Sequence, residues 1–472
     1  MVAIEPGLEL TDDAPVGSAI GDPAARRVPA QVPVERYISP AWAALEDAHV
    51  WPRTWVLACT VDHVGGPGDV FEFVLGKLSV LVVRGDDGEL RAFQNACRHR
   101  GSALCTGSEQ GLEHIRCPYH RWTWDLQGRL REVPSRRGFG PIRNDDLGLL
   151  DVAVDTWGPL VFVNLDTGAA PLAEYLGALP DIVAWADLDR YACRYDLTVA
   201  MDCNWKTLIE GFSETYHVQG IHREMLPSVD DVNSENRLIG RHGCLLQPYG
   251  IASPRLRDGA TDDEIWQSLM VTQGGRYGVD AADPGPVPER APGETMRDLF
   301  ERMIRARART QGWSFDHLDQ SQLLDLFQLN MFPNVSIIVM ADTITCLRAR
   351  PGATPDESLM DVVSLQRLPD GADRPGPPIC ATVDPADTSL GLVFDQDVAN
   401  LGAVQRGLHQ PGLTHLVLSR EEMRIMNLHR NLEEYIDMES DFDPATIAEI
   451  DALRGSVPAP PSHSAHRQEA GA

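Results

Sequence analysis

Apolar residues between about 55 and 165 come in short runs that are separated by turn-forming residues. The breaks include Gly65-Gly66-Pro67-Gly68, Asp86-Asp87-Gly88 and Gln127-Gly128. Short apolar runs bounded by such residues are typical of β-strands joined by hairpins. The pattern therefore predicts an all-β unit with strands at 56–59, 70–74, 78–83, 90–93, 122–125, 130–133 and 160–165.

The pattern changes after Pro171, where longer helical stretches appear. Residues 172–185 and 205–225 are predicted helices, with a strand at 195–201 between them, and residues 226–290 have no clear periodicity. Residues 295–309 are amphipathic, because Met296, Leu299, Phe300, Met303 and Ile304 repeat at helical spacing. We expect 226–320 to form an insertion that either covers a pocket as a lid or packs as a peripheral helix.

The last third of the chain predicts strands at 335–340, 343–350 and 360–367, an antiparallel meander, followed by helices at 398–407 and 420–436. Ser39-Pro40 starts a helix within 37–54, with Ser39 as the N-cap. Residues 1–36 and 457–472 read as disordered ends. The expected organisation is α+β, with an all-β domain at 55–168 and a second domain at 169–456.

Composition and charge narrow the classes of protein. The chain has 472 residues, a formal charge of −28 and 43% hydrophobic residues. This charge argues against nucleic acid or an anionic membrane as a partner. Nine cysteines without a framework spacing indicate a reducing compartment, and neither a signal peptide nor a membrane span is evident. A cytoplasmic protein is expected.

Two short clusters combine cysteine with histidine. Cys97 and His99 form a Cys-x-His pair, and Cys117 and His120 form a Cys-x-x-His pair. These ligands suit zinc or an iron–sulfur cluster. In zinc sites the histidines usually follow both cysteines, whereas each cluster here mixes the two types. Two thiolates and two imidazoles are the ligands of a Rieske [2Fe–2S] centre.

These motifs resemble the Rieske signature of the α subunits of bacterial oxygenases. The resemblance rests on Cys97-Arg98-His99-Arg100-Gly101 and Cys117-Pro118-Tyr119-His120. Respiratory Rieske proteins have an extra cysteine after each ligand pair, but Tyr119 occupies the second such position here, so Cys105 has no evident disulfide partner. The chain also departs from the oxygenases at Arg121, where glycine is common, and this affects the loop geometry and the surface around it.

A second group of candidate ligands lies at 204–222. His217 and His222 are five residues apart and would point about 140° apart on a regular helix, so the helix must open for both to face one ion. Gly220 is a candidate for that opening. Glu214 precedes His217 by three residues and can reach it.

This stretch resembles the mononuclear iron motif of Rieske oxygenases. The resemblance implies that His217 and His222 bind Fe(II), and that Glu214 links His217 to the Rieske histidine His120 of a neighbouring subunit. At Gly211 many relatives have asparagine. The third ligand is expected to be Asp397, within Phe394-Asp395-Gln396-Asp397, although Asp395 or either acid as a helix cap is the alternative.

The resemblance implies a terminal oxygenase, with a Rieske domain inserted in a helix-grip catalytic domain that has an antiparallel sheet. The Rieske cluster would pass electrons to Fe(II), which activates O2. Since no glycine-rich dinucleotide motif follows a strand, we expect a separate NAD(P)H-dependent flavin reductase, with or without a ferredoxin. A head-to-tail homotrimer is also implied.

The substrate is the most open question. Residues 330–338 resemble the apolar pocket strand of aromatic-ring-hydroxylating relatives, which favours an apolar aromatic or cyclic substrate, but they also read as a core strand. A monooxygenase or demethylase acting on a quaternary amine or an N- or O-methyl group is the alternative. An electron-transfer protein and a zinc-stabilised binding protein are rivals that leave Glu214, His217 and His222 unexplained.

Overall fold

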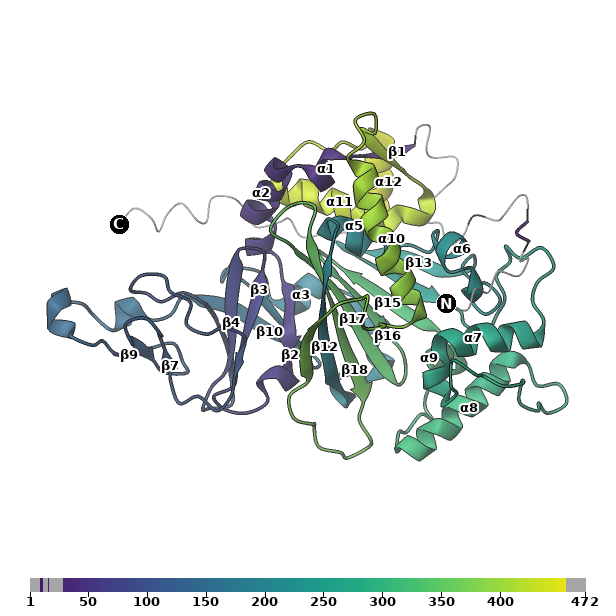
Figure 1. Ribbon diagram of the computed structural model, residues 1–472, viewed down its shortest axis with the longest axis horizontal. Helices are drawn as coiled ribbons and strands as arrows, with labels where there is room; N and C mark the ends of the chain where they lie inside the picture. The colour runs from purple at the N-terminus through teal and green to yellow at the C-terminus, as the bar shows by residue number, and fades with distance from the viewer. Residues whose placement is uncertain (1–8, 12–15, 17–28, 456–472) are drawn as a thin grey trace.

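Two antiparallel sheets stand side by side and define the molecule (Figure 1). The computed structural model describes residues 9–11, 16 and 29–455. The larger sheet has the strand order β13-β14-β15-β16-β17-β18-β12-β19, and only the β12–β19 pair is parallel. Its strands are β12 (Tyr191–Met201), β13 (Glu235–Ile239), β14 (His242–Gln247), β15 (Leu326–Met331), β16 (Val335–Val339), β17 (Thr343–Pro351), β18 (Ser358–Arg367) and β19 (Ile379–Val383).

The second sheet confirms the all-β unit expected between 55 and 168. It has the strand order β2-β11-β10-β5-β4-β3-β6, and a small sheet β7-β8-β9 extends beyond it at the left of Figure 1. The strands are β2 (Val56–Thr60), β3 (Val70–Leu75), β4 (Leu78–Arg84), β5 (Leu90–Gln94), β6 (Ser108–Glu109), β7 (Ile115–Arg116), β8 (Thr123–Trp124), β9 (Leu130–Glu132), β10 (Asp151–Trp157) and β11 (Leu160–Asn164). The predicted α+β class is therefore correct.

Helices cover the larger sheet at its ends and on one face. They are α1 (Glu35–Ile38), α2 (Pro40–His49), α3 (Leu172–Leu176), α4 (Leu179–Ile182), α5 (Trp205–Glu210), α6 (Val218–Ile221), α7 (Asp262–Tyr277), α8 (Met296–Gln311), α9 (Gln320–Leu324), α10 (Leu392–Leu408), α11 (Met423–Ile436) and α12 (Pro444–Arg454), with short 3-10 turns between some of them. Across the described residues, no helix combines the length and the apolar content that crossing a bilayer requires.

Several predicted elements differ from those observed. The expected helix 172–185 is divided into α3, α4 and a 3-10 turn, and the region 226–290, expected to be irregular, contains β13, β14 and α7. In α7, Gly274 and Gly275 obscure the helical pattern, but Trp266, Leu269 and Met270 are buried on one face. Packing against α8 supplies the stability that local propensity does not.

The N-terminal expectations are only partly met. Ala30–Pro33 form β1, which pairs with β20 (His415–Leu418), so this end of the segment expected to be disordered is ordered. Ser39 caps α2 as predicted, since its Oγ accepts a hydrogen bond from the Trp42 N–H. The rest of the expectation for 1–36 falls mainly on residues outside those described, as does the expected tail at 457–472.

A buried arginine joins the two sheets. Arg348 on β17 pairs with Asp361 on β18 at 2.7 Å, and its Nη1 donates to the carbonyl oxygens of Leu57 and Ala58 on β2 at 2.9 and 2.8 Å. Because both charges are fully enclosed, a change in the angle between the sheets would break these bonds inside a medium of low polarity. The two units are therefore fixed relative to each other.

A second buried ion pair anchors the start of α5. Lys206 and Glu46 are almost completely buried, and Nζ lies 2.6 Å from Oε1. The Glu46 carboxylate also accepts hydrogen bonds from the indole N–H groups of Trp42 and Trp205, both at 2.8 Å. All the groups around Glu46 are donors, so only an ionised carboxylate satisfies them.

Replacing this carboxylate should destabilise the fold. Glu46→Gln leaves Lys206 without a counter-ion and turns an amide N–H₂ toward other donors, so we expect the free energy of unfolding to fall by about 3–5 kcal/mol. Denaturant unfolding followed by tryptophan fluorescence measures this change. The matched control is Asp47→Asn, which removes an ion pair to the exposed Lys77 and should leave the stability unchanged. Equal stability of Glu46→Gln and the parent would contradict the assignment.

Candidate functional site

The two Cys/His clusters lie on two loops of the same construction. The Cys97 N–H donates to the Ser102 carbonyl and the Cys97 carbonyl accepts from the Gly101 N–H, at 2.8 and 2.9 Å. Cys117 makes the equivalent bonds with Trp122 and Arg121, at 2.9 and 3.0 Å. The loops follow β5 and β7 and thus lie on a rigid β scaffold.

The two histidines of these clusters lie next to each other, and the Cys97 and Cys117 thiols are within hydrogen-bonding reach of one another. The rings of His99 and His120 are 4.7 Å apart, and Trp122 stacks on His99 at 5.2 Å. His99 Nδ1 is buried and has no hydrogen-bond partner among the described residues. A buried ring nitrogen without a partner is unfavourable unless it binds a ligand, so the geometry fits a metal at this position.

Metal binding needs ionised thiols, and the two thiols differ in how readily they ionise. Burial raises the pKa of the Cys97 thiol. At Cys117 burial acts in the same direction, but the backbone N–H groups of His120 and Tyr119 outweigh it and lower the pKa. Burial, together with the neighbouring His120 and Arg100, lowers the pKa of His99 and keeps that imidazole neutral. All nine cysteines are free, including Cys105.

The second candidate site is built around a break in a helix. The expected continuous helix 205–225 is wrong: α5 ends at Glu210, and α6 does not begin until Val218. The opening was expected at Gly220, but Gly220 lies inside α6. His217 is instead the residue before α6 and still has a helical backbone, whereas His222 follows α6 with φ of −111° and ψ of 44°. The chain therefore leaves helical geometry at His222, and the two ring centroids lie 5.1 Å apart.

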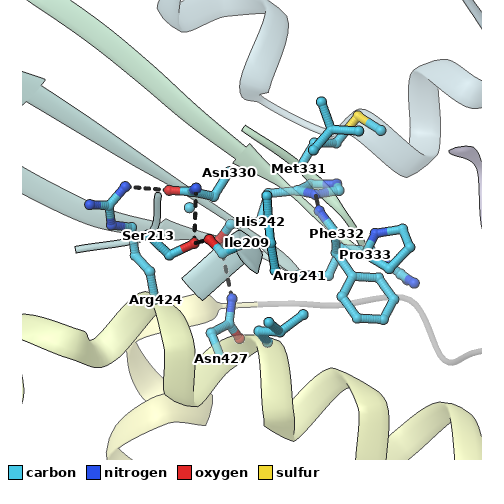
Figure 2. Close-up of a pocket in the computed structure, with 13 residues that line it drawn as sticks. Ile209, Ser213, Arg241, His242, Asn330, Met331, Phe332, Pro333, Arg424 and Asn427 are labelled. Carbon is cyan, nitrogen blue, oxygen red and sulfur yellow. Dashed lines mark hydrogen bonds between the residues drawn. The ribbon is translucent and has the colours of Figure 1, made fainter. Parts of the chain in front are cut away.

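Strand β15 satisfies the backbone that this break releases. The Phe212 carbonyl accepts hydrogen bonds from Gln328 Nε2 and Asn330 Nδ2, both at 2.9 Å. Arg424 on α11 donates to the side-chain oxygens of both amides and so fixes their orientation. Figure 2 shows its contact with Asn330. Asn330 also donates to Ser213 Oγ at 3.1 Å. The irregular segment is therefore held by the sheet and not by helix capping.

His217, His222 and Asp397 form a group that could hold one metal ion. Their ligand atoms lie within 4.8 Å of one another. Asp397 Oδ1 is 2.9 Å from His222 Nε2 and 3.9 Å from His217 Nε2. Both nitrogens of the buried His222 ring face oxygens, but a neutral imidazole has only one N–H. A cation shared with Asp397 resolves this conflict, so the residues fit a metal.

Each histidine is oriented by an acceptor behind it. Glu214 Oε1 lies 2.6 Å from His217 Nδ1, and Glu214 Oε2 accepts the His217 backbone N–H at 3.0 Å. Gln396 Oε1 lies 2.7 Å from His222 Nδ1. Burial disfavours the charged form of His217, but the Glu214 carboxylate outweighs burial and raises the pKa. Both contacts place the N–H on Nδ1 and leave Nε2 free for a metal.

The position of Asp397 follows from a helix that starts earlier than expected. α10 begins at Leu392 instead of 398, so both candidate acids lie within it. Asp395 turns back to the helix start, where it accepts from the Leu390 N–H and the Ser389 hydroxyl at 2.8 and 2.6 Å. Asp397 lies two residues further on, about half a turn around the helix, among the histidines. The structure thus separates the two acids as a cap and a candidate ligand.

A cavity of about 320 Å³ opens on the Glu214 side of this group. Glu210, Glu214, Asp397 and Glu422 line it, and no lysine or arginine does. Tyr37 Oη donates to the Glu210 carboxylate at 2.9 Å, and burial raises the pKa of Glu210 to about 8. The cavity wall is therefore largely apolar but carries four acidic side chains and no lysine or arginine.

Some functional side chains gave little signal in the sequence. Gln396 lies between two acids, and the sequence provided no reason to place it on a helix because the predicted helix started only at 398. Gln328, Asn330 and Arg424 are polar residues in otherwise buried elements, and that combination is the available signal, because buried polar side chains need partners. The sequence alone does not say which backbone group they meet.

The two sites are far apart within the chain. The Cys/His loops, next to β7 and β8, lie at the left end of Figure 1, whereas α6 with the second histidine pair lies on the right. The larger sheet stands between them. Direct contact between the two sites of one chain is excluded by this arrangement.

Comparisons with known proteins agree with this geometry. A family model for the ring hydroxylating alpha subunit (catalytic domain) matches residues 188–438, and one for the Rieske [2Fe-2S] domain matches residues 54–150. The glycine betaine monooxygenase oxygenase subunit of Chromohalobacter salexigens is 33% identical over 201 residues, and the biphenyl 2,3-dioxygenase subunit alpha of Rhodococcus jostii is 31% identical over 201 residues. These alignments cover 42% and 38% of this chain, and 44% and 41% of those proteins, so the chain matches less than half of each relative.

Solved structures share the fold over a greater length. A quaternary ammonium Rieske monooxygenase described in connection with carnitine oxidation has a TM-score of 0.62 at 16% identity, over 86% of this chain and 95% of that one. A naphthalene 1,2-dioxygenase variant bound to phenanthrene also has a TM-score of 0.62, at 17% identity, over 90% and 97%. The two family models match the regions that contain the larger and the smaller sheet. The chain therefore belongs to the ring-hydroxylating oxygenase α-subunit family and carries a Rieske [2Fe-2S] domain.

Proposed function

We propose that this chain is a terminal oxygenase that hydroxylates a small organic substrate with O2. The observation that carries the proposal is the grouping of His217, His222 and Asp397 within 4.8 Å. Two histidines and one carboxylate leave positions open on a non-heme iron, which suits oxygen chemistry better than structural metal binding. An electron-transfer protein would not need this second site, and a zinc-stabilised binding protein would need neither.

The residues divide the work between two metal groups. When bound, a [2Fe–2S] cluster on Cys97, His99, Cys117 and His120 would supply electrons one at a time, and Fe(II) on His217, His222 and Asp397 would supply O2 activation. Glu214 and Gln396 orient the two iron histidines through their Nδ1 atoms. The amides of β15 hold the Phe212 carbonyl and keep the loop between the helices in position.

Electrons are proposed to cross between subunits. Since the two sites of one chain lie at opposite ends of the molecule, Glu214 would meet His120 of a neighbouring copy, as in a head-to-tail homotrimer. A carboxylate hydrogen-bonded to an imidazole on each side is a short connection between two metal groups. An NAD(P)H-dependent flavin reductase, with or without a ferredoxin, would reduce the cluster. Each hydroxylation consumes O2, two electrons and two protons and releases one water.

A quaternary amine is the proposed substrate class. Curated relatives include monooxygenases named for glycine betaine, choline and carnitine. The aromatic or cyclic substrate expected from the sequence rested on 330–338, but Met331, Val335 and Ile337 pack in the main core and Asn330 braces the Phe212 loop. Because the chain is also similar to biphenyl and naphthalene dioxygenases, an aromatic ring compound is the second candidate substrate.

The proposed iron ligands can be tested without knowing the substrate. His217→Ala and His222→Ala should each keep the visible absorption of the Rieske cluster and lose the mononuclear iron, because the two metal groups share no ligand. Metal and acid-labile sulfide analysis should fall from three irons and two sulfides per chain to two irons and two sulfides. Loss of the visible absorption in either variant, or a parent protein with zinc and no sulfide, would refute the assignment.

Gln396 should control metal affinity without being a ligand. Gln396→Leu removes the acceptor behind His222 Nδ1, so we expect iron or Co(II) at this site to bind about 10–100-fold more weakly. Competition with a chelator measures the affinity, and the Rieske absorption should not change. Asp395→Asn is the matched control on the same helix turn, since Asp395 bonds only the helix start, and its metal affinity should equal that of the parent.

Substrate class can be assigned by coupled consumption of O2 and NADH. With a surrogate reductase, quaternary amines such as glycine betaine, choline and carnitine should stimulate consumption and yield an oxidised product in equal amount. Naphthalene and biphenyl should give consumption without product. Formation of a cis-diol from an aromatic ring would instead establish the second candidate.

A further inference from the structure

The loops that contain Cys97 and Cys117 have the same backbone hydrogen bonds, so their positions can be matched. They differ at one matched position, which is Gly101 in the first loop and Arg121 in the second. Gly101 and Arg121 each donate their N–H to the carbonyl of the loop cysteine four residues earlier, and both have left-handed backbones, with φ of +71° and +59°. Glycine adopts this conformation freely, but a residue with a side chain does so at a cost. One loop thus has the residue that the geometry favours, and the other has an arginine.

The described residues of the protomer do not account for this arginine. The Arg121 side chain is exposed, and within the described part of the chain its guanidinium has neither a hydrogen bond nor an ion pair. The Arg121 backbone donates to the Cys117 carbonyl and accepts a hydrogen bond from the Thr123 hydroxyl. Strain that the local structure does not require points to a function of the side chain.

Arg121 belongs to a basic segment of an otherwise acidic protein, residues 97–143, whose exposed side chains we term the basic surface. Residues 97–143 contain nine arginines against four acids, a formal charge of +5 in a chain of −28. Two large side chains near the loops are also exposed, Tyr119 at 59% and Phe139 at 40%. Such a mixture of arginine and exposed aromatic residues is typical of protein interfaces.

The cavity beside His217 has the complementary character. Four carboxylates line it without any lysine or arginine. Asp397 faces the proposed iron, which leaves Glu422 as an acid with no cation near it in the described cavity wall. Burial and the nearby Glu214 raise the pKa of Glu422. Val404 and Val417, exposed at 40% and 63%, stand on the same wall and offer apolar contact.

We propose that the Arg121 guanidinium enters this acidic cavity in a second copy of the chain, near Glu422. The inference rests on the proposed function, in which His120 meets Glu214 of the neighbouring copy. Arg121 follows His120 directly, so the same encounter brings it to the cavity wall. Charge and apolar surface are complementary on the two sides, and the ion pair holds the cluster loop in register with Glu214.

Arg121→Gly separates docking from folding. Glycine suits φ of +59°, so the variant should keep the Rieske absorption and have a thermal midpoint at least as high as that of the parent. In a single turnover with substrate and O2, oxidation of the pre-reduced cluster should become at least fivefold slower. The rate should also lose most of its dependence on ionic strength, because the screened ion pair is gone. Arg143→Gln, on the same basic surface, is the control and should behave as the parent.

A double-mutant cycle tests the partner residue. Glu422→Gln should slow cluster oxidation in the parent but should add little in the Arg121→Gly background, since the same interaction is already lost. Additive effects would show that the two residues act separately and would overturn the pairing. The charge exchange Arg121→Glu with Glu422→Lys should recover part of the rate that Arg121→Glu alone loses.

Other outcomes would also overturn the proposal. If Arg121→Gly oxidises its cluster at the parental rate, the side chain has no docking role. If only reduction of the cluster by the external reductase slows, the reductase is the occupant of the basic surface instead of a second copy. Failure of the proposed function is distinguishable, because the parent protein would then lack the third iron before any variant is made.

Discussion

The interruption between α5 and α6 is the constraint on which the rest of the site depends. Histidines five residues apart cannot bind one ion from a regular helix, and the chain leaves helical geometry at His222, directly after α6. The interruption before α6 places Glu214 and His217 beside that residue. The released Phe212 carbonyl would be costly to bury alone, and the amides of Gln328 and Asn330 compensate it. The sheet, through these amides, therefore determines where Glu214 and His217 lie.

The two iron-site histidines are not equivalent in their surroundings. His217 is backed by the Glu214 carboxylate, and His222 by the neutral Gln396 amide. A carboxylate makes the imidazole more electron-donating than an amide does. His217 is also the more exposed of the two, at 20% of its side chain against 2%, and it borders the acidic cavity. The site thus has an open, electron-rich side and a closed, neutral side.

The sequence predicted best what depends on local pattern and ligand chemistry. The turn-separated strands of the smaller sheet, the meander β16-β17-β18 and the Ser39 cap all follow from short-range features. The mixed Cys/His clusters were recognisable because few other arrangements use those residue types at that spacing. The choice of Asp397 over Asp395 agrees with the geometry, although its role as a ligand remains a proposal.

The predictions that the structure did not match share one physical cause, which is stabilisation by tertiary contacts. The helix break fell at 211–217 and not at Gly220, because the partners that compensate it come from β15, more than a hundred residues away. α7, β13 and β14 have weak local signals and are stabilised by packing against neighbours. Gln396 acts through an atom of His222 that lies 174 residues away in sequence, a relation that no local pattern carries.

The ion pair between Arg348 and Asp361, with its bonds to the β2 backbone, has a further consequence for what counts as the functional unit. It prevents the cluster loops from swinging toward the iron ligands of their own chain. Under the proposed assembly, a defect at Cys97 and a defect at His217 in the same polypeptide therefore interrupt different electron paths. Each path uses the cluster of one protomer and the iron site of the next. A chain defective only at the cluster and a chain defective only at the iron site can therefore complement each other when both are present in one assembly.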